Sequence, residues 1–142
     1  MKEKEKILTL MQTCRDRENF YKMAAKDTLD HDLIPLFNQL EFQSRQFLYE
    51  LETYSGIPFL QHDPDELNYK LGKILSELKE VFYRAGTAKM LKNAIKAEES
   101  FLKKYSCDKL PEFLHAICGS QASFVRTNLK KLKNYTRETQ LS

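Results

Sequence analysis

Apolar residues recur every three or four positions along nearly the whole chain, and this spacing restricts the fold more than any other feature. An α-helix has about 3.6 residues per turn, so side chains at this spacing line one face, whereas a half-buried strand alternates apolar and polar residues. No segment shows such an alternation. Gly and Pro number only four each, so few turns interrupt the elements. The sequence therefore predicts an all-α fold of long helices.

Five amphipathic segments are predicted to be helices. They cover approximately residues 3–26, 33–51, 66–84, 87–105 and 111–132. Pro35 belongs in the first turn of the second helix, because proline is not tolerated further inside, and Asp30 or Asp32 is the expected cap. Gly56 and Pro58 end that helix. A length of 142 residues suits one domain, so residues 1–142 are predicted to form a single bundle.

Composition argues against several classes of function. The net charge of +3 is spread over both signs without a concentrated basic face, so we expect neither nucleic acid nor membrane as a partner. No apolar run reaches the roughly 18 residues of a membrane helix. Cys14, Cys107 and Cys118 have no metal-binding spacing and are expected to be free thiols. With no recognisable signal peptide, a cytoplasmic location is predicted.

Motifs for catalysis are also missing. His31, His62 and His115 are scattered without a partner at ligand spacing, and no Gly-rich phosphate loop or Ser-His-Asp arrangement can be nominated. No catalytic residue and no small-molecule substrate can therefore be identified.

The two halves of the chain match each other at an offset of 80 residues. Glu18 and Glu41 are 23 residues apart, and Glu98 and Gln121 have the same separation. The offset also aligns apolar residues: Leu10 with Met90, Met11 with Leu91, Tyr21 with Phe101, and Phe37 with Ile117. The duplication predicts that the four polar residues occupy equivalent places in the bundle.

These four polar residues lie on apolar stripes rather than on outer faces. If the stripes face a common core, the polar side chains converge there. A buried carboxylate without a partner costs several kcal/mol, so it is neutralised, hydrogen-bonded or bound to a cation. Two interpretations stay open: an oxygen-rich metal site, or a buried polar cluster of Glu18, Glu41, Glu98, Gln121, Ser44 and Tyr21.

At these positions the sequence resembles the ferritin-like superfamily, and more closely a bacterial family of ferritin-like four-helix-bundle proteins filed as a domain of unknown function. The resemblance covers about residues 5–135 and lies in Cys14 to Tyr21, the helix of residues 33–51, Ala97 to Tyr105, and Leu110-Pro111-Glu112. It implies a ferritin-like four-helix bundle with an additional crossover helix between bundle helices two and three. Residues 66–84 would form that crossover helix.

Ferritin-like di-iron proteins carry one Glu on each of two helices and a Glu-x-x-His on each of the other two. By this resemblance, Glu18 and Glu98 match the single glutamates and Glu41 matches the first Glu-x-x-His. Ser44 stands in place of its histidine. At the second motif, Gln121 and Phe124 replace both ligands. The resemblance thus implies a degenerate metal site.

The prediction for function is a non-enzymatic bundle without a cofactor, either stress-related, as the superfamily suggests, or an oligomerising interaction module. Its alternative is a divergent carboxylate protein that binds iron or another divalent metal weakly through Glu18, Glu41 and Glu98. A homodimer is the candidate assembly, formed through the second flank of the crossover helix with Tyr69, Phe82 and Tyr83.

Overall fold

The computed structural model describes residues 2–59, 90–105 and 111–141, and these form an all-helical structure. The long helices are α1 (Lys2–Asp27), α2 (Ile34–Ser55), α4 (His115–Leu141) and an unlabelled helix of residues 90–104. Short 3-10 turns, η1 (His31–Leu33) and η3 (Glu112–Leu114), precede α2 and α4. No strand occurs within these ranges, which confirms the all-α class. The predicted crossover helix of residues 66–84, with Tyr69, Phe82 and Tyr83, lies outside the described residues.

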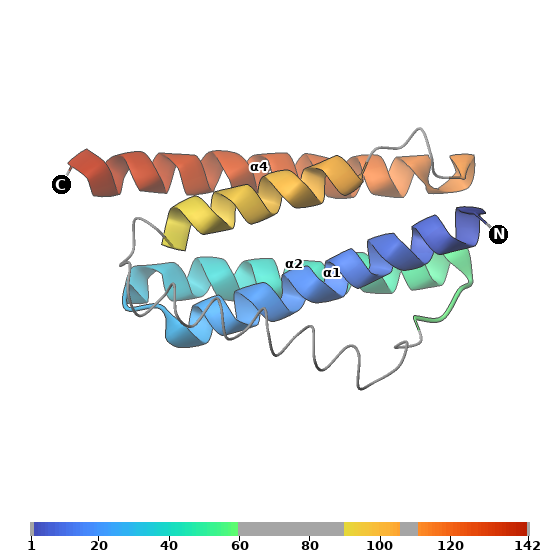
Figure 1. Ribbon diagram of the computed structural model, residues 1–142, viewed down its shortest axis with the longest axis horizontal. Coiled ribbons are helices and arrows are strands. Elements are labelled where there is room, and N and C mark those ends of the chain that lie inside the picture. The colour runs from blue at the N-terminus through green and yellow to red at the C-terminus, as the bar shows by residue number, and fades with distance from the viewer. Residues whose placement is uncertain (1, 60–89, 106–110, 142) are drawn as a thin grey trace.

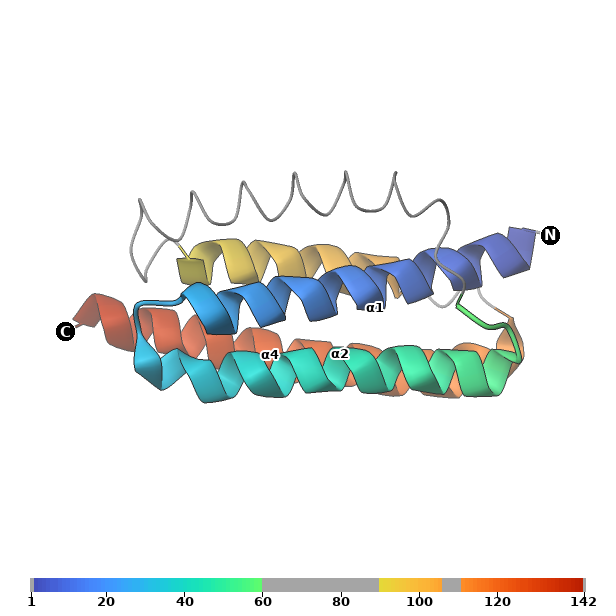
Figure 2. The ribbon, with the colours of Figure 1, turned by 90° about the horizontal axis from the view of Figure 1, so that it is seen from below.

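The four long helices of the described part lie side by side (Figures 1 and 2). α1 neighbours α2 on one flank and the helix of residues 90–104 on the other, and α4 closes the arrangement between those two. Successive helices α1 and α2 run in opposite directions, as do the helix of residues 90–104 and α4. The two ends of the chain lie at opposite ends of the bundle (Figure 1).

The predicted end of α2 at Gly56 is confirmed, whereas its own N-cap is Leu33, which makes no side-chain cap hydrogen bond. The Asp30 carboxylate accepts a hydrogen bond of 3.0 Å from the Asp32 backbone N–H and so caps η1, which leads directly into α2. Pro35 lies in the first turn of α2, where its missing N–H leaves no hydrogen bond unmade. At the other end, Gly56 adopts a left-handed conformation with φ of 70°, a conformation that favours glycine.

The core consists of two apolar clusters, one towards each end of the bundle. The first joins the beginning of α1 to the second half of α2 and the start of α4, and includes Leu10, Met11, Cys14, Phe47, Leu51, Tyr105, Leu114 and Cys118. The second joins the end of α1 to the start of α2, and includes Tyr21, Ala24, Leu33, Phe37, Leu40, Leu91, Ala94 and Leu132. Buried polar residues, among them Arg17, Ser44, Glu98 and Asn128, lie at the positions between the two clusters.

One residue with the helical spacing of the apolar stripe of the last helix, one position before Val125, lies largely outside the core. Phe124 on α4 is 52% exposed, although its ring still lies 6.3 Å from the Phe47 ring between α2 and α4. Its position at the flank of the helix, rather than facing the interior, explains the difference. None of the helices in the described ranges is long and apolar enough to span a membrane.

Candidate functional site

The centre of the bundle is occupied by an ion pair between Arg17 of α1 and Glu98 of the helix of residues 90–104. Arg17 Nε donates to Glu98 Oε1 at 2.8 Å, and Arg17 Nη2 donates to Glu98 Oε2 at 3.0 Å. Both side chains are almost entirely buried, with 1% and 0% of their surface exposed. This bidentate geometry matches the planar guanidinium to the carboxylate and gives each charge its counter-ion in place of water.

The remaining Arg17 donors reach α2 and, through it, α4. Arg17 Nη1 donates to Ser44 Oγ at 2.9 Å, and Arg17 Nη2 donates to Gln43 Oε1 at 2.9 Å. Gln43 Oε1 also accepts from Asn128 Nδ2 at 2.7 Å. The Ser44 hydroxyl in turn donates a hydrogen bond of 2.7 Å to the Leu40 carbonyl oxygen. We call Arg17, Gln43, Ser44, Glu98 and Asn128 the central polar layer, and it takes a side chain from every long helix in the described part.

Aromatic rings surround the Arg17 guanidinium. Its central carbon lies 5.4 Å from the centroids of the Tyr21 and Phe47 rings and 5.9 Å from that of Phe101. Cation–π attraction supplements the hydrogen bonds at these distances, more strongly where water is excluded. Burial alone would lower the pKa of Arg17, but the adjacent Glu98 carboxylate outweighs it and raises the pKa above its ordinary value. Arg17 is therefore a permanent cation.

Two of the predicted site residues join this layer directly. Glu98 and Ser44 both accept hydrogen bonds from Arg17. Tyr21 contributes a ring against the guanidinium, and burial together with Glu98 raises the pKa of its hydroxyl. Gln121 is buried nearby, where its Nε2 donates to the Phe47 carbonyl at 3.2 Å. The Tyr21 hydroxyl and Gln121 Oε1 have no hydrogen-bond partner within the described ranges.

The predicted convergence of all four polar side chains does not occur. The Glu18 carboxylate accepts two hydrogen bonds, of 3.0 and 3.1 Å, from Nη1 of Arg15 one turn earlier on α1. Glu41 lies half-buried at the edge of α2, with Arg45 Nη2 at 3.6 Å. The reason is local: each of these carboxylates pairs with an arginine three or four residues away on its own helix. Glu18 is nevertheless buried, as predicted, whereas Glu41 is partly exposed.

Glu18, Glu41 and Glu98 thus each face a different arginine. No group of three or more His, Cys, Asp or Glu side chains comes together in the parts of the chain that the structure describes. A divalent cation beside Glu98 would also meet the fixed positive charge of Arg17, and like charges at such range repel. As arranged, these residues do not fit a di-iron centre. Both Glu98 oxygens are held by Arg17, so Glu98 is equally unsuited to act as a general base.

Sequence reasoning missed three members of the central polar layer: Arg17, Gln43 and Asn128. Arg17 stands at helical spacing between Cys14 and Tyr21, and Asn128 between Val125 and Leu132, so both occupy positions of the apolar stripe. A cation on an apolar stripe opposite a carboxylate on another stripe was the available signal.

The Cys14 thiol lies one turn from Arg17, inside the first apolar cluster. Its Sγ is 3.4 Å from the Tyr105 hydroxyl. Burial raises the pKa of Cys14 to about 11, against an opposing effect of the Tyr105 hydrogen bond. The thiolate that a nucleophile needs is therefore disfavoured. Cys118 is likewise buried and is not part of a disulfide, whereas Cys107 lies outside the described residues.

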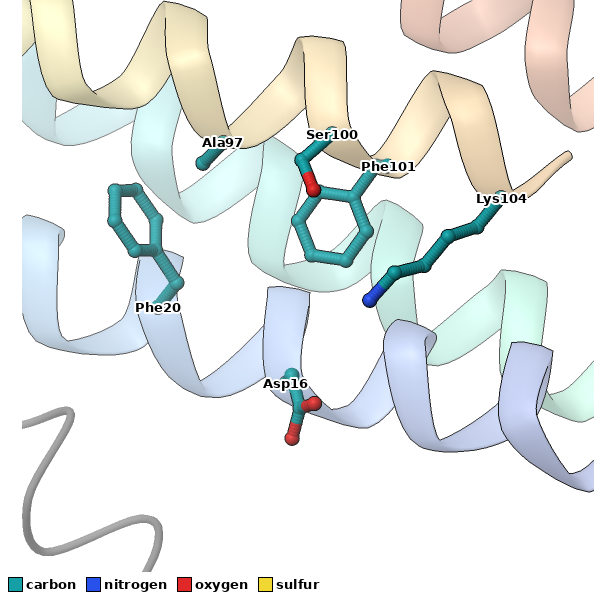
Figure 3. Close-up of a pocket in the computed structure, with 6 residues that line it drawn as sticks. All are labelled: Asp16, Phe20, Ala97, Ser100, Phe101 and Lys104. Atoms are coloured by element: carbon teal, nitrogen blue, oxygen red, sulfur yellow. The ribbon is translucent and has the colours of Figure 1, made fainter.

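A shallow pocket of about 160 Å³ opens between α1 and the helix of residues 90–104 (Figure 3). It is lined by Asp16, Phe20, Ala97, Ser100, Phe101 and Lys104. The Phe101 ring separates it from Arg17, and the Asp16 carboxylate accepts a hydrogen bond of 2.9 Å from Gln12. Its six lining residues include no histidine or cysteine.

Comparisons of this chain with protein-family models, with curated proteins and with solved structures gave no match. The interpretation of the site therefore rests on its own geometry.

Proposed function

We propose that this chain is a non-enzymatic, ferritin-like helical bundle that acts through its surface, with an arginine–glutamate pair standing where a di-iron protein holds metal. The observation that carries the proposal is the buried, bidentate contact of Arg17 with Glu98. A carboxylate satisfied in this way needs no metal to offset its burial.

The connection between α2 and the helix of residues 90–104 supports the ferritin-like topology with a crossover helix. The C-terminal end of α2 and the start of the helix of residues 90–104 lie at opposite ends of the bundle, because the two helices run in the same direction (Figure 1). Residues 60–89 therefore join opposite ends of the bundle, which is the role of a crossover in a bundle of this kind. Their apolar stripe, from Leu67 to Phe82, suits a helix that covers one side.

The pairing of all three candidate ligands with arginines supports a bundle without a metal. Glu18 faces Arg15 and Glu41 faces Arg45, with nitrogen–oxygen distances of 3.0 and 3.6 Å. Glu98 faces Arg17 at 2.8 Å. Each positive charge takes the place of part of the charge that two iron ions would supply.

Metal analysis of the purified full chain, followed by titration with ferrous iron in the absence of oxygen, tests the proposal. We expect far less than one equivalent of metal per chain and no saturable uptake. An isosteric Glu98→Gln variant serves as the control and should give the same titration as the unmodified chain.

The divergent metal-binding alternative makes the opposite prediction. About two equivalents of tightly held iron, lost in a Glu41→Ala variant, would establish a carboxylate-bound metal centre of the di-iron kind and overturn the proposal. One weakly held equivalent lost in Glu98→Gln would also overturn it, because Glu98 would then be a ligand rather than the counter-ion of Arg17.

A further inference from the structure

The exposed aromatic side chains of the described residues all belong to the neighbouring helices α2 and α4 and to η3. Apart from Leu29 in the turn after α1, every exposed large apolar side chain in the described ranges belongs to α2, η3 or α4: Phe42, Tyr49, Tyr54, Phe113 and Phe124. By contrast, α1 and the helix of residues 90–104 expose no such aromatic. We call the outer surface of α2, η3 and α4 the aromatic face.

The aromatic face includes a row of side chains on α2 and, beside it, Phe124 of α4. Phe42 and Tyr49 are seven residues apart and therefore lie on one line of α2, away from the interior-facing positions of Phe37, Leu40 and Ser44. Phe124 of α4 lies at the boundary of α2 and α4, beside Phe47. Tyr49, in the row on α2, is 71% exposed. Large exposed apolar patches of this kind on a soluble bundle mark interaction sites.

The charges of the two helices in this face are opposite. α2 carries three carboxylates, Glu41, Glu50 and Glu52, and one cation, Arg45. Between His115 and Arg137, α4 carries no carboxylate and five cations: Arg126, Lys130, Lys131, Lys133 and Arg137. Of these, Lys133 lies on the other flank of α4, where its Nζ is 3.9 Å from Glu99 Oε1 of the helix of residues 90–104, so four cations remain for this face. A twofold axis parallel to the helices would place the acidic α2 of one copy on the basic α4 of the other, twice over. An axis across the helices would instead oppose α2 to α2 and α4 to α4, setting like charges together.

The size of the face is adequate for such an association. The 22 residues of α2 span about 33 Å, and two helices packed about 10 Å apart present a surface roughly 20 Å wide. About 600 to 700 Å² would then be covered on each copy, close to the roughly 800 Å² per partner of a stable interface.

We propose that the aromatic face binds the same face of a second copy of this chain, with α2 of each copy against α4 of the other. The proposal rests on the function proposed above, a bundle that acts through its surface, and names the partner. It differs from dimerisation through residues 66–84, because it uses only α2, η3 and α4.

Light scattering after size exclusion, over roughly two decades of protein concentration, measures the association of the full chain. We expect a concentration-dependent dimer. The double variant Phe42→Ser/Tyr49→Ser should raise its dissociation constant about tenfold or more, because exposed aromatics at an interface centre carry much of its energy. Leu29→Ser, which removes an equally exposed apolar side chain away from the face, is the matched control and should leave the constant unchanged.

A charge reversal then tests the arrangement of the two copies. Lys130→Glu/Lys131→Glu should weaken the dimer, whereas Lys22→Glu/Lys26→Glu makes the same change in charge on the exposed surface of α1 and should not. Tightening by Lys130→Glu/Lys131→Glu would mean that α4 faces α4 and would overturn the proposed exchange. A strict monomer, a monomer that copurifies with nucleic acid, or a dimer insensitive to the aromatic variant would overturn the interface itself.

Metal analysis of the same samples separates the two proposals. A dimer that holds stoichiometric iron would refute the metal-free bundle and leave the interface intact. A metal-free monomer would refute the interface and leave the metal-free bundle intact.

Discussion

The pair Arg17–Glu98 and the pair Arg45–Glu41 join the same two residue types but lie in opposite surroundings. The first is buried and bidentate at the bundle centre, while in the second the nitrogen–oxygen distance is 3.6 Å and 57% of the Arg45 side chain is exposed. At the surface, water would solvate each charge if the ion pair were broken, so the pair adds little stability. In the interior no water can do so, and breaking the pair leaves a buried charge without a partner. The comparison teaches that burial, rather than residue type, decides what each arginine contributes to the fold.

The largest effect is expected from Arg17→Met, which removes the central cation and keeps most of the side-chain volume. Glu98 would remain buried without its counter-ion, so the free energy of unfolding should fall by about 3–5 kcal/mol. Urea denaturation followed by circular dichroism measures it. Urea is preferable to guanidinium chloride, because a guanidinium ion could occupy the place of Arg17.

The double variant Arg17→Met/Glu98→Leu is the control for that result. Removing both charges eliminates the unpaired carboxylate, so most of the lost stability should return. A single variant as stable as the unmodified chain would mean that the buried pair contributes no more than a surface pair. Should Arg17→Met fail to fold, recovery of folding in the double variant carries the same information.

An intermediate effect is expected from alkaline pH, because the contrast between buried and exposed groups extends to Cys14. Its thiol loses a proton near pH 9.0 in the unfolded chain and near pH 11 in the folded one. The stability that the protonated Cys14 thiol contributes is therefore fully present below pH 9 and is lost as the pH rises from 9 through 11. The free energy of unfolding should fall by about 2–3 kcal/mol over this range. Urea unfolding at intervals from pH 8 to 11 measures it.

A Cys14→Ala variant should flatten this pH dependence without abolishing it, since burial also raises the pKa values of Tyr21 and Tyr105. An unmodified chain whose stability is constant from pH 8 to 11 would show that Cys14 is accessible to water. It would then not belong to the same interior as Arg17.

The smallest effects should separate the two pairs that each lie within a single helix, Arg15–Glu18 and Arg45–Glu41. Arg15 donates twice to a Glu18 carboxylate that is nearly buried, so Arg15→Ala should cost about 1 kcal/mol. Arg45→Ala should cost at most about 0.5 kcal/mol, as is usual for an exposed pair four residues apart. Urea midpoints of the two variants, compared at low and high salt, rank them. Equal losses would show that the partial burial of Glu18 makes no difference.

The helical elements could be predicted from the sequence because their causes are local. Apolar spacing, the position of Pro35 and the left-handed Gly56 identify α2 without knowledge of its neighbours. Burial of Glu18, Glu98, Gln121, Ser44 and Tyr21 followed from the same spacing.

The partners of these side chains could not be predicted in this way. The 80-residue repeat makes Glu18 and Glu98 equivalent in sequence, but Glu18 pairs with Arg15 of its own helix, whereas Glu98 pairs with Arg17 of another helix. Spacing puts Arg17, but not Arg15, on the apolar stripe of α1. Which carboxylate of another helix Arg17 meets depends on how the helices are rotated against each other, and spacing within a single helix does not fix that rotation. Glu41 was placed in the core for the same reason, although it stands at the edge of its stripe.

Gln43 has a consequence for how the helices are aligned along their length. Its single side-chain oxygen accepts from Arg17 and from Asn128, so α1, α2 and α4 meet at one atom. Apolar side chains can slide past one another by a turn with little loss, but these hydrogen bonds have one axial register in which all are made. The central polar layer therefore favours one axial alignment of the helices. A shift by one turn would leave buried polar or charged groups without their hydrogen-bond partners, and the misaligned bundle would be less stable than the native one.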